Sequence, residues 1–186
     1  MEFEYKNIPA DTKIVHAIDY KKIIGESADV NLEEPKLYDS MLELGWKMVK
    51  TCLVDGGVGL AAPQLGFPKK IFIMVGFDNP WYWQFNGKFT LCMNPTWTTA
   101  PGSETRTEPE GCLSVPGQTL SITRYQEIDV TYWAFNEKKK LEKVVDRVVG
   151  YPARIYQHER EHLFGTSIVD VNLRQFGGKK QKKGKR

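Results

Sequence analysis

The sequence has few of the features that mark secreted, membrane or repetitive proteins. Its 186 residues include only three cysteines, and this odd number argues against a disulfide framework and favours a reducing compartment. The longest apolar runs, such as residues 71–75, are far shorter than the ~20 residues of a membrane-spanning helix. No repeat of fixed period occurs. These absences exclude a disulfide scaffold, an integral membrane protein and a solenoid.

Signals for targeting are also lacking. The first residues, MEFEYKNIPADTK, have no apolar stretch after a basic start, and their acidic side chains argue against a transit peptide. Hydrophobic residues make up 41% of the chain and charged residues 26%, close to the average of globular proteins. We therefore expect a folded cytoplasmic protein without a signal or transit peptide.

The formal net charge of +3 is unevenly distributed. Residues 177–186 read GGKKQKKGKR and hold six of the 26 lysines and arginines, so 20 basic residues face 23 acidic ones in residues 1–176. A basic segment interrupted by glycine cannot build a core. We predict one catalytic or binding domain over residues 1–176 and a flexible basic tail over residues 177–186.

Apolar periodicity predicts a helix and a hairpin in the first half of the chain. Apolar side chains recur at steps of three and four over residues 35–52, which is typical of a helix with one buried face. The apolar runs 71–76 and 91–97 predict strands, and Asn86-Gly87 predicts a hairpin turn between them. The helix is expected to pack on this sheet.

The second half of the chain predicts strands followed by a helix. Residues 121–135 and 141–146 are rich in β-branched and aromatic side chains and predict two antiparallel neighbours. Residues 152–164 predict a late helix that Gly165 ends. The predicted class is therefore α+β, with antiparallel sheets packed around the late helix.

Two of the three histidines, His158 and His162, lie four residues apart on this late helix, in the sequence HEREH. At this spacing of an HExxH motif, both imidazoles project from one face and can reach a single metal ion. Glu159 lies about 100° around the helix, where it can touch a metal-bound water as a general base. The alternative is a solvated helix face whose histidines bind nothing.

A catalytic metal site usually takes three protein ligands, so a third must be found. The longer motif HExxHxxGxxH places Ile168 at the third position, where it cannot coordinate a metal, and Asp170 follows His162 too closely. Upstream, Cys112 is the best candidate, because the segment EGCLSVP permits close approach of the backbone. The less suitable upstream candidates are His16, Cys52 and Cys92.

The sequence resembles the peptide deformylase family, because three motifs of that family occur in order. They are GVGLAAPQ at 57–64, EGCLS at 110–114 and QHEREH at 157–162. The resemblance extends from about residue 35 to residue 170. It implies a metal-dependent hydrolase that removes the N-formyl group from the initiator methionine of nascent polypeptides and releases formate.

The resemblance also implies the metal site. Its ligands are Cys112, His158 and His162, and Glu159 is the catalytic carboxylate that acts as general base and acid on a metal-bound water. The family implies one divalent ion, Fe(II), in this site. Zinc, nickel or cobalt can replace it, because thiolate and imidazole donors suit all four metals.

Other roles follow from the resemblance. The side chain of Gln64 and the backbone N–H of Leu113 are expected to face the developing oxyanion, and Gly59 to pair with the substrate backbone. Val58 and Glu110 are expected on the substrate side as well. The alternative for Gln64 is an amide that only ties its loop to the sheet. For the methionine side chain, the pocket candidates are Val58, Tyr151 and Ile155.

The sequence departs from the family at three places. Position 161 is Glu161 where the family usually has aspartate, and this change concerns contacts around the metal site rather than ligation. Residues 77–89 form a longer and more aromatic segment than usual. The N-terminal residues lack the common Pro-x-Leu-Arg segment. We expect activity to survive the change at position 161.

Two rival functions remain open. One is a metallohydrolase that acts on another acyl group, and the other is an RNA- or ribosome-binding module with a vestigial pocket. The complete ligand set and Glu159 oppose the second. The expected partners are N-formylmethionyl nascent peptides. For the lysines and arginine of residues 179–186, binding of ribosomal RNA is one hypothesis, and a solubilising tail or a localisation signal are the alternatives. We expect a monomer that does not bind membranes.

Overall fold

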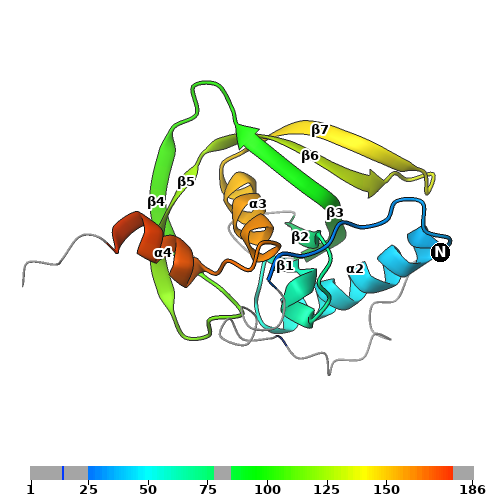
Figure 1. Ribbon diagram of the computed structural model, residues 1–186, viewed down its shortest axis with the longest axis horizontal. Helices are drawn as coiled ribbons and strands as arrows, with labels where there is room; N and C mark the ends of the chain where they lie inside the picture. Colours follow the sequence, from blue (N-terminus) through cyan, green and yellow to red (C-terminus); the bar gives the residue numbers. More distant parts are fainter. Residues whose placement is uncertain (1–13, 15–24, 78–84, 178–186) are drawn as a thin grey trace, which may run out of the picture.

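The computed structural model describes residue 14 and residues 25–77 and 85–177. The predicted α+β class is confirmed: these described residues form two antiparallel sheets and three α-helices (Figure 1). One sheet has five strands in the order β1-β2-β3-β6-β7, and the other pairs β4 with β5. The helices are α2 (Leu37–Val54), α3 (Tyr151–His162) and α4 (Ile168–Phe176), with a 3-10 turn η2 at Ala62–Leu65. The strands are β1 (Gly59–Ala61), β2 (Ile71–Phe77), β3 (Phe85–Thr99), β4 (Thr105–Gly111), β5 (Thr119–Tyr125), β6 (Glu127–Phe135) and β7 (Leu141–Val149).

Helix α2 packs against the β1–β2 end of the large sheet, as its apolar stripe predicts. Met48, Val49 and Cys52 are fully buried in one cluster with side chains of β2, including Ile73. Burial of such side chains contributes about 1.5–3 kcal/mol each to folding. This packing fixes the position of the chain that leaves α2 and enters β1.

Helix α3 lies in the middle of the molecule, between the small sheet and the large one (Figure 1). Tyr156 is fully buried, its ring meets Phe72 of β2 edge to face at 4.9 Å, and its hydroxyl donates to the Thr96 carbonyl at 3.0 Å. On another face, Gln157 bonds both the N–H and the C=O of Tyr125 in β5. The helix is therefore anchored to both sheets.

Two sequence predictions about strands are wrong in detail. Residues 121–135 do not form one strand: the chain bends at Gln126, whose N–H donates to Glu104 and whose carbonyl accepts from Gly150. The part before the bend pairs with β4, and only the part after it pairs with β7. Asn86-Gly87 lies inside β3 rather than at a turn, and the connection 78–84 lies outside the described residues.

Helix α4 was not predicted, and it covers the outer edge of β5. The Gln175 amide accepts from the N–H of Thr123 and donates to its carbonyl, both at 2.9 Å. Asn172 donates to the carbonyl of Ser121 at 2.9 Å. These contacts occupy backbone groups that an edge strand otherwise leaves open.

Within the part of the chain described, the helices are too short or too polar to cross a membrane.

Candidate metal centre

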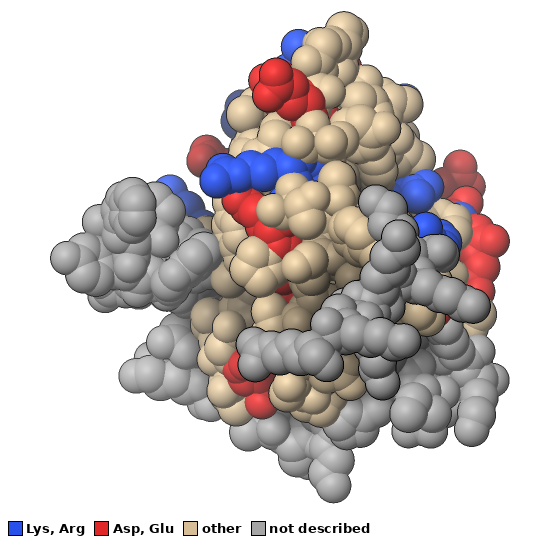
Figure 2. Space-filling view, turned by 90° about the vertical axis from the view of Figure 1, so that its left-hand side faces the viewer, with Lys and Arg blue, Asp and Glu red and all other residues tan. Residues whose placement is uncertain are grey.

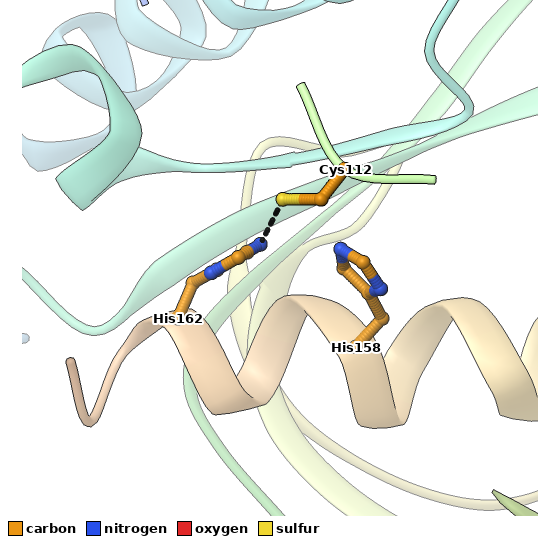
Figure 3. A group of neighbouring side chains, drawn as sticks. All are labelled: Cys112, His158 and His162. Atoms are coloured by element: carbon orange, nitrogen blue, oxygen red, sulfur yellow. Dashed lines mark hydrogen bonds between the residues drawn. The ribbon is translucent and has the colours of Figure 1, made fainter. Parts of the chain in front are cut away.

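The side chains of Cys112, His158 and His162 lie close together (Figure 3). Cys112 follows directly on β4, and the two histidines project from one face of α3 toward it, one turn apart. One donor atom from each residue lies within 4.8 Å of the other two. The Cys112 Sγ is 3.4 Å from His162 Nε2. Three donors this close can bind one small ion.

Hydrogen bonds orient both imidazoles. His158 Nδ1 contacts Glu110 Oε2 at 3.0 Å, and His162 Nδ1 contacts the Thr166 carbonyl at 3.1 Å. An acceptor at Nδ1 holds a proton there and leaves Nε2 as the nitrogen that faces the cysteine. The ring orientations are thus set by neighbours that are not themselves donors of the cluster.

The chemistry of the donor set fits a divalent transition metal. Burial alone raises the pKa of Cys112, but the electrostatic influence of His162 and hydrogen bonds with both histidines outweigh burial and lower the pKa to about 5. A thiolate therefore forms readily, and the thiolate is the form that binds metals. Among the described residues, this is the one group of His, Cys, Asp and Glu side chains with such geometry.

Glu159 lies beside the cluster and is 4% exposed. Burial raises its pKa to about 7, although the neighbouring imidazoles oppose this shift. Its Oε2 has no hydrogen-bond partner among the residues that the structure describes. A buried carboxylate oxygen without a partner is costly unless it serves a ligand or a reaction, so Glu159 can exchange a proton with a molecule held at the cluster.

A cavity of about 280 Å³ opens beside these residues. Its wall is formed in part by Cys112, His158 and Glu159. All the residues predicted to bind the oxyanion, the substrate backbone or the methionine side chain also line it. His162 is the one predicted ligand that is not part of this wall. The predicted residues that line the cavity besides those three are Val58, Gly59, Gln64, Glu110, Leu113, Tyr151 and Ile155.

Gln64 is held at the cavity wall by two hydrogen bonds. Its Oε1 accepts from the backbone N–H of Ala61 at 2.8 Å, and its Nε2 donates to the hydroxyl of Ser114 at 3.0 Å. The amide therefore does tie its own turn together, which was the alternative reading from sequence. One N–H of Nε2 remains for a second acceptor, so this tie does not exclude a contact with substrate.

Glu110 was expected on the substrate side, and both of its carboxylate oxygens bond protein groups. Oε1 accepts from Arg124 at 3.0 Å and from Arg154 at 2.6 Å, and Oε2 accepts from Arg124 at 3.0 Å besides contacting His158. Burial raises the pKa of Glu110, but bonds from His158 and Arg124 outweigh it and lower the pKa to about 2. These contacts suit an anion that orients His158.

Glu161 reaches the same ion network. Its Oε1 lies 2.7 Å from Arg124 Nη1, so Arg124 bridges Glu161 of α3 and Glu110 of β4. The side chain points to an arginine rather than to the donor cluster, which agrees with the expectation that position 161 is not a ligand. The extra methylene relative to aspartate is accommodated in a partly exposed position.

Sequence reasoning missed Arg154 and Ser114. Arg154 is buried, donates to Glu110, and contacts Glu108 Oε2 at 3.0 Å. Its position four residues before His158 is a signal that could have found it, because residues four apart share a helix face. Ser114 belongs to the motif EGCLS, but its contact with Gln64 has no local signal, since the two residues are 50 positions apart.

The remaining ligand candidates lie apart from the cluster or outside the described residues. Cys52 is buried in α2 and contacts the Gly59 carbonyl at 3.4 Å, and Cys92 is buried in β3. Burial raises the pKa of both thiols, which opposes metal binding. His16, most of the aromatic segment 77–89 and residues 178–186 of the tail lie outside the described residues.

Peptide deformylases are among the known proteins that this chain resembles in sequence and fold. The family model for polypeptide deformylase matches residues 16–175. Peptide deformylase of Orientia tsutsugamushi (strain Boryong) is 36% identical over 136 residues, which cover 71% of this chain and 73% of that protein. A probable peptide deformylase structure from Synechococcus phage S-SSM7 superposes with a TM-score of 0.70 at 30% identity, covering 87% of this chain and 99% of the other.

A second structure, the class I type b peptide deformylase from Acinetobacter baumannii with bound Met-Ala-Ser, has a TM-score of 0.69 and 28% identity. The match covers 88% of this chain and 99% of that one. The family model spans the residues of the cavity and of the donor cluster. The chain therefore belongs to the polypeptide deformylase family of hydrolases.

Proposed function

We propose that the chain hydrolyses the N-formyl group of the initiator methionine on nascent polypeptides and releases formate. Removal of this group is the activity of the family to which the chain belongs. The observation that carries the proposal is the convergence of Cys112, His158 and His162 donor atoms within 4.8 Å, with the buried carboxylate of Glu159 beside them. These residues suit metal-assisted hydrolysis of a small amide.

In this proposal Cys112, His158 and His162 hold one divalent cation, which when bound lowers the pKa of a water molecule and polarises the formyl carbonyl. Glu159 takes a proton from the attacking water and returns it to the departing amine. A pKa of about 7 lets one carboxyl group both accept and donate a proton near neutral pH. Family resemblance alone favours Fe(II) as the working metal, because the thiolate and imidazole donors suit zinc, nickel and cobalt as well.

The remaining wall residues bind and orient the substrate. The free N–H of Gln64 and the backbone N–H of Leu113 donate to the oxygen that becomes negative, and one such donor is worth roughly 3–4 kcal/mol in the transition state. Gly59 offers its backbone to the substrate backbone. Val58, Tyr151 and Ile155 give the cavity an apolar part for the methionine side chain. The Acinetobacter relative, whose structure contains Met-Ala-Ser, supports a substrate of this class.

The proposal is tested by anaerobic purification with metal analysis, followed by assay of formate release from an N-formylmethionyl peptide. Release that depends on iron, nickel or cobalt supports it. Cleavage of an unformylated or internal amide without formate release would instead support the rival metallohydrolase. An acetylated peptide of the same sequence is the matched control, because it differs from the substrate only at the acyl group.

We also propose a cytoplasmic monomer whose body, residues 1–176, carries the activity and whose basic tail contacts ribosomal RNA. The support for the tail is its composition alone: six positive and no negative side chains over ten residues. Phosphate backbones attract such segments. An enzyme that acts on emerging chains gains substrate by this contact, because it stays near the site of synthesis.

A further inference from the structure

Ser114 contacts the side chain to which we assign oxyanion stabilisation. It lies two residues after Cys112, and its hydroxyl accepts from Gln64 Nε2 at 3.0 Å. Gln64 Oε1 accepts from the Ala61 N–H at 2.8 Å. Gln64 and Ser114 are each only 2% exposed. Bulk water therefore does not compete for these two hydrogen bonds.

The contact with Ala61 decides which way the Gln64 amide faces, and the contact with Ser114 holds its NH₂ group in place. A primary amide has one carbonyl oxygen and two N–H groups. The backbone N–H of Ala61 can only donate, so the carbonyl oxygen faces Ala61 and the NH₂ group faces Ser114. The Ser114 hydroxyl takes one of the two N–H groups. The other is left for the cavity that Gln64 lines.

We propose that Ser114 is a positioning residue, whose hydroxyl holds the Gln64 amide so that its second N–H is presented to the substrate oxygen. The inference rests on the proposed function. The same bond joins the turn η2 to the loop that carries Cys112 and Leu113. It therefore keeps both oxyanion donors at a fixed distance from the donor cluster.

The test compares kcat and KM for an N-formylmethionyl peptide in Ser114→Ala, Gln64→Ala and the double variant, with the metal content of each. Loss of a whole oxyanion donor costs about 10²–10³ in kcat, so a loosened donor should cost about tenfold, with KM changed less than about twofold. In the Gln64→Ala background, Ser114→Ala should change kcat less than about twofold, because the amide is already absent. Ser114→Thr, which keeps the hydroxyl, should recover most of the lost kcat.

Ser103→Ala is the matched control. It removes a hydroxyl that accepts from the Glu127 N–H at 2.9 Å, away from the cavity wall, and should leave kcat unchanged. The proposal is overturned if Ser114→Ala lowers kcat by the same factor with and without Gln64, leaves kcat unchanged, or loses metal in proportion to activity. If Ser114→Ala fails to fold, Ser114→Cys repeats the test with a similar volume and a weaker acceptor. A native, metal-loaded chain that releases no formate contradicts the proposed function instead.

Discussion

At the scale of single residues, Gly59 permits the close approach of Glu159. A Cβ atom at position 59 would lie 2.6 Å from Glu159 Oε1 and 2.9 Å from its Cδ. Contacts this short do not occur in folded proteins, so any side chain at position 59 displaces the carboxylate. Position 59 therefore needs glycine because a larger residue would clash with Glu159. This reason is independent of any contact between the Gly59 backbone and substrate.

We predict that Gly59→Ala lowers kcat by about 10- to 100-fold, because a proton acceptor displaced by even ~1 Å transfers protons poorly. The metal content should stay near that of the native chain, since none of the three donors is touched. Steady-state kinetics and metal analysis check both expectations. Gly111→Ala is the control, because it adds a methyl group at the same wall with no atom within 4 Å of it apart from those of its two chain neighbours. Equal kcat in the two variants would contradict this account.

At the scale of elements, one ion network joins β4, β5 and α3. Glu110 of β4 bonds Arg124 of β5 and Arg154 of α3, and Arg124 also bonds Glu161 of α3. All but Glu161 are less than 10% exposed. Since Cys112 follows β4 and the two histidines belong to α3, this network sets the distance between the ligands.

Removing the negative charge of Glu110, at the centre of this network, should therefore lower the stability of the fold. Glu110→Gln leaves two buried guanidinium groups without their common anion, and we expect it to lower the free energy of unfolding by about 3–5 kcal/mol. Urea unfolding at equal metal content measures this loss. Glu108→Gln is the control, because Glu108 is 31% exposed and should cost less than about 1 kcal/mol. Equal losses in both variants would show that the network does not carry this stability.

The same elements show what sequence can predict. The spacing of His158 and His162 settles their common face, because helix geometry is local. By contrast, β4 reads TRTEPEG and has no apolar alternation, and it is held by β5 and by Arg154 from a distant helix. The break at Gln126 also depends on partners far along the chain. Contacts between residues that lie far apart in the sequence leave no periodic pattern in it, so they could not be predicted.

At the scale of the whole molecule, the formal net charge of +3 is the sum of a weakly acidic body and a basic tail. The family model ends at residue 175, just before the tail begins. The cavity and the donor cluster lie wholly in the body. The charge that could attract RNA and the groups proposed for catalysis are thus separate in the sequence, so each can be changed alone.

We predict that deleting residues 177–186 leaves formate release from a free peptide within about twofold of the full chain and weakens binding to ribosomes. Binding by the full chain should fall steeply between about 50 and 200 mM salt, because the contact releases counterions. Cosedimentation with ribosomes measures both effects. A tail of the same length with glutamine in place of lysine is the control for length. Equal ribosome binding by all three chains would reject a role for the charge.

The central claim is that Glu159 moves the proton while three other side chains hold the metal, and one variant separates these roles. Glu159→Gln keeps the shape of the side chain but cannot accept a proton. Formate release by this variant, purified anaerobically beside the native chain, should fall by about 10²–10⁴-fold while the metal content stays the same. Turnover near that of the native chain at equal metal content would contradict the account.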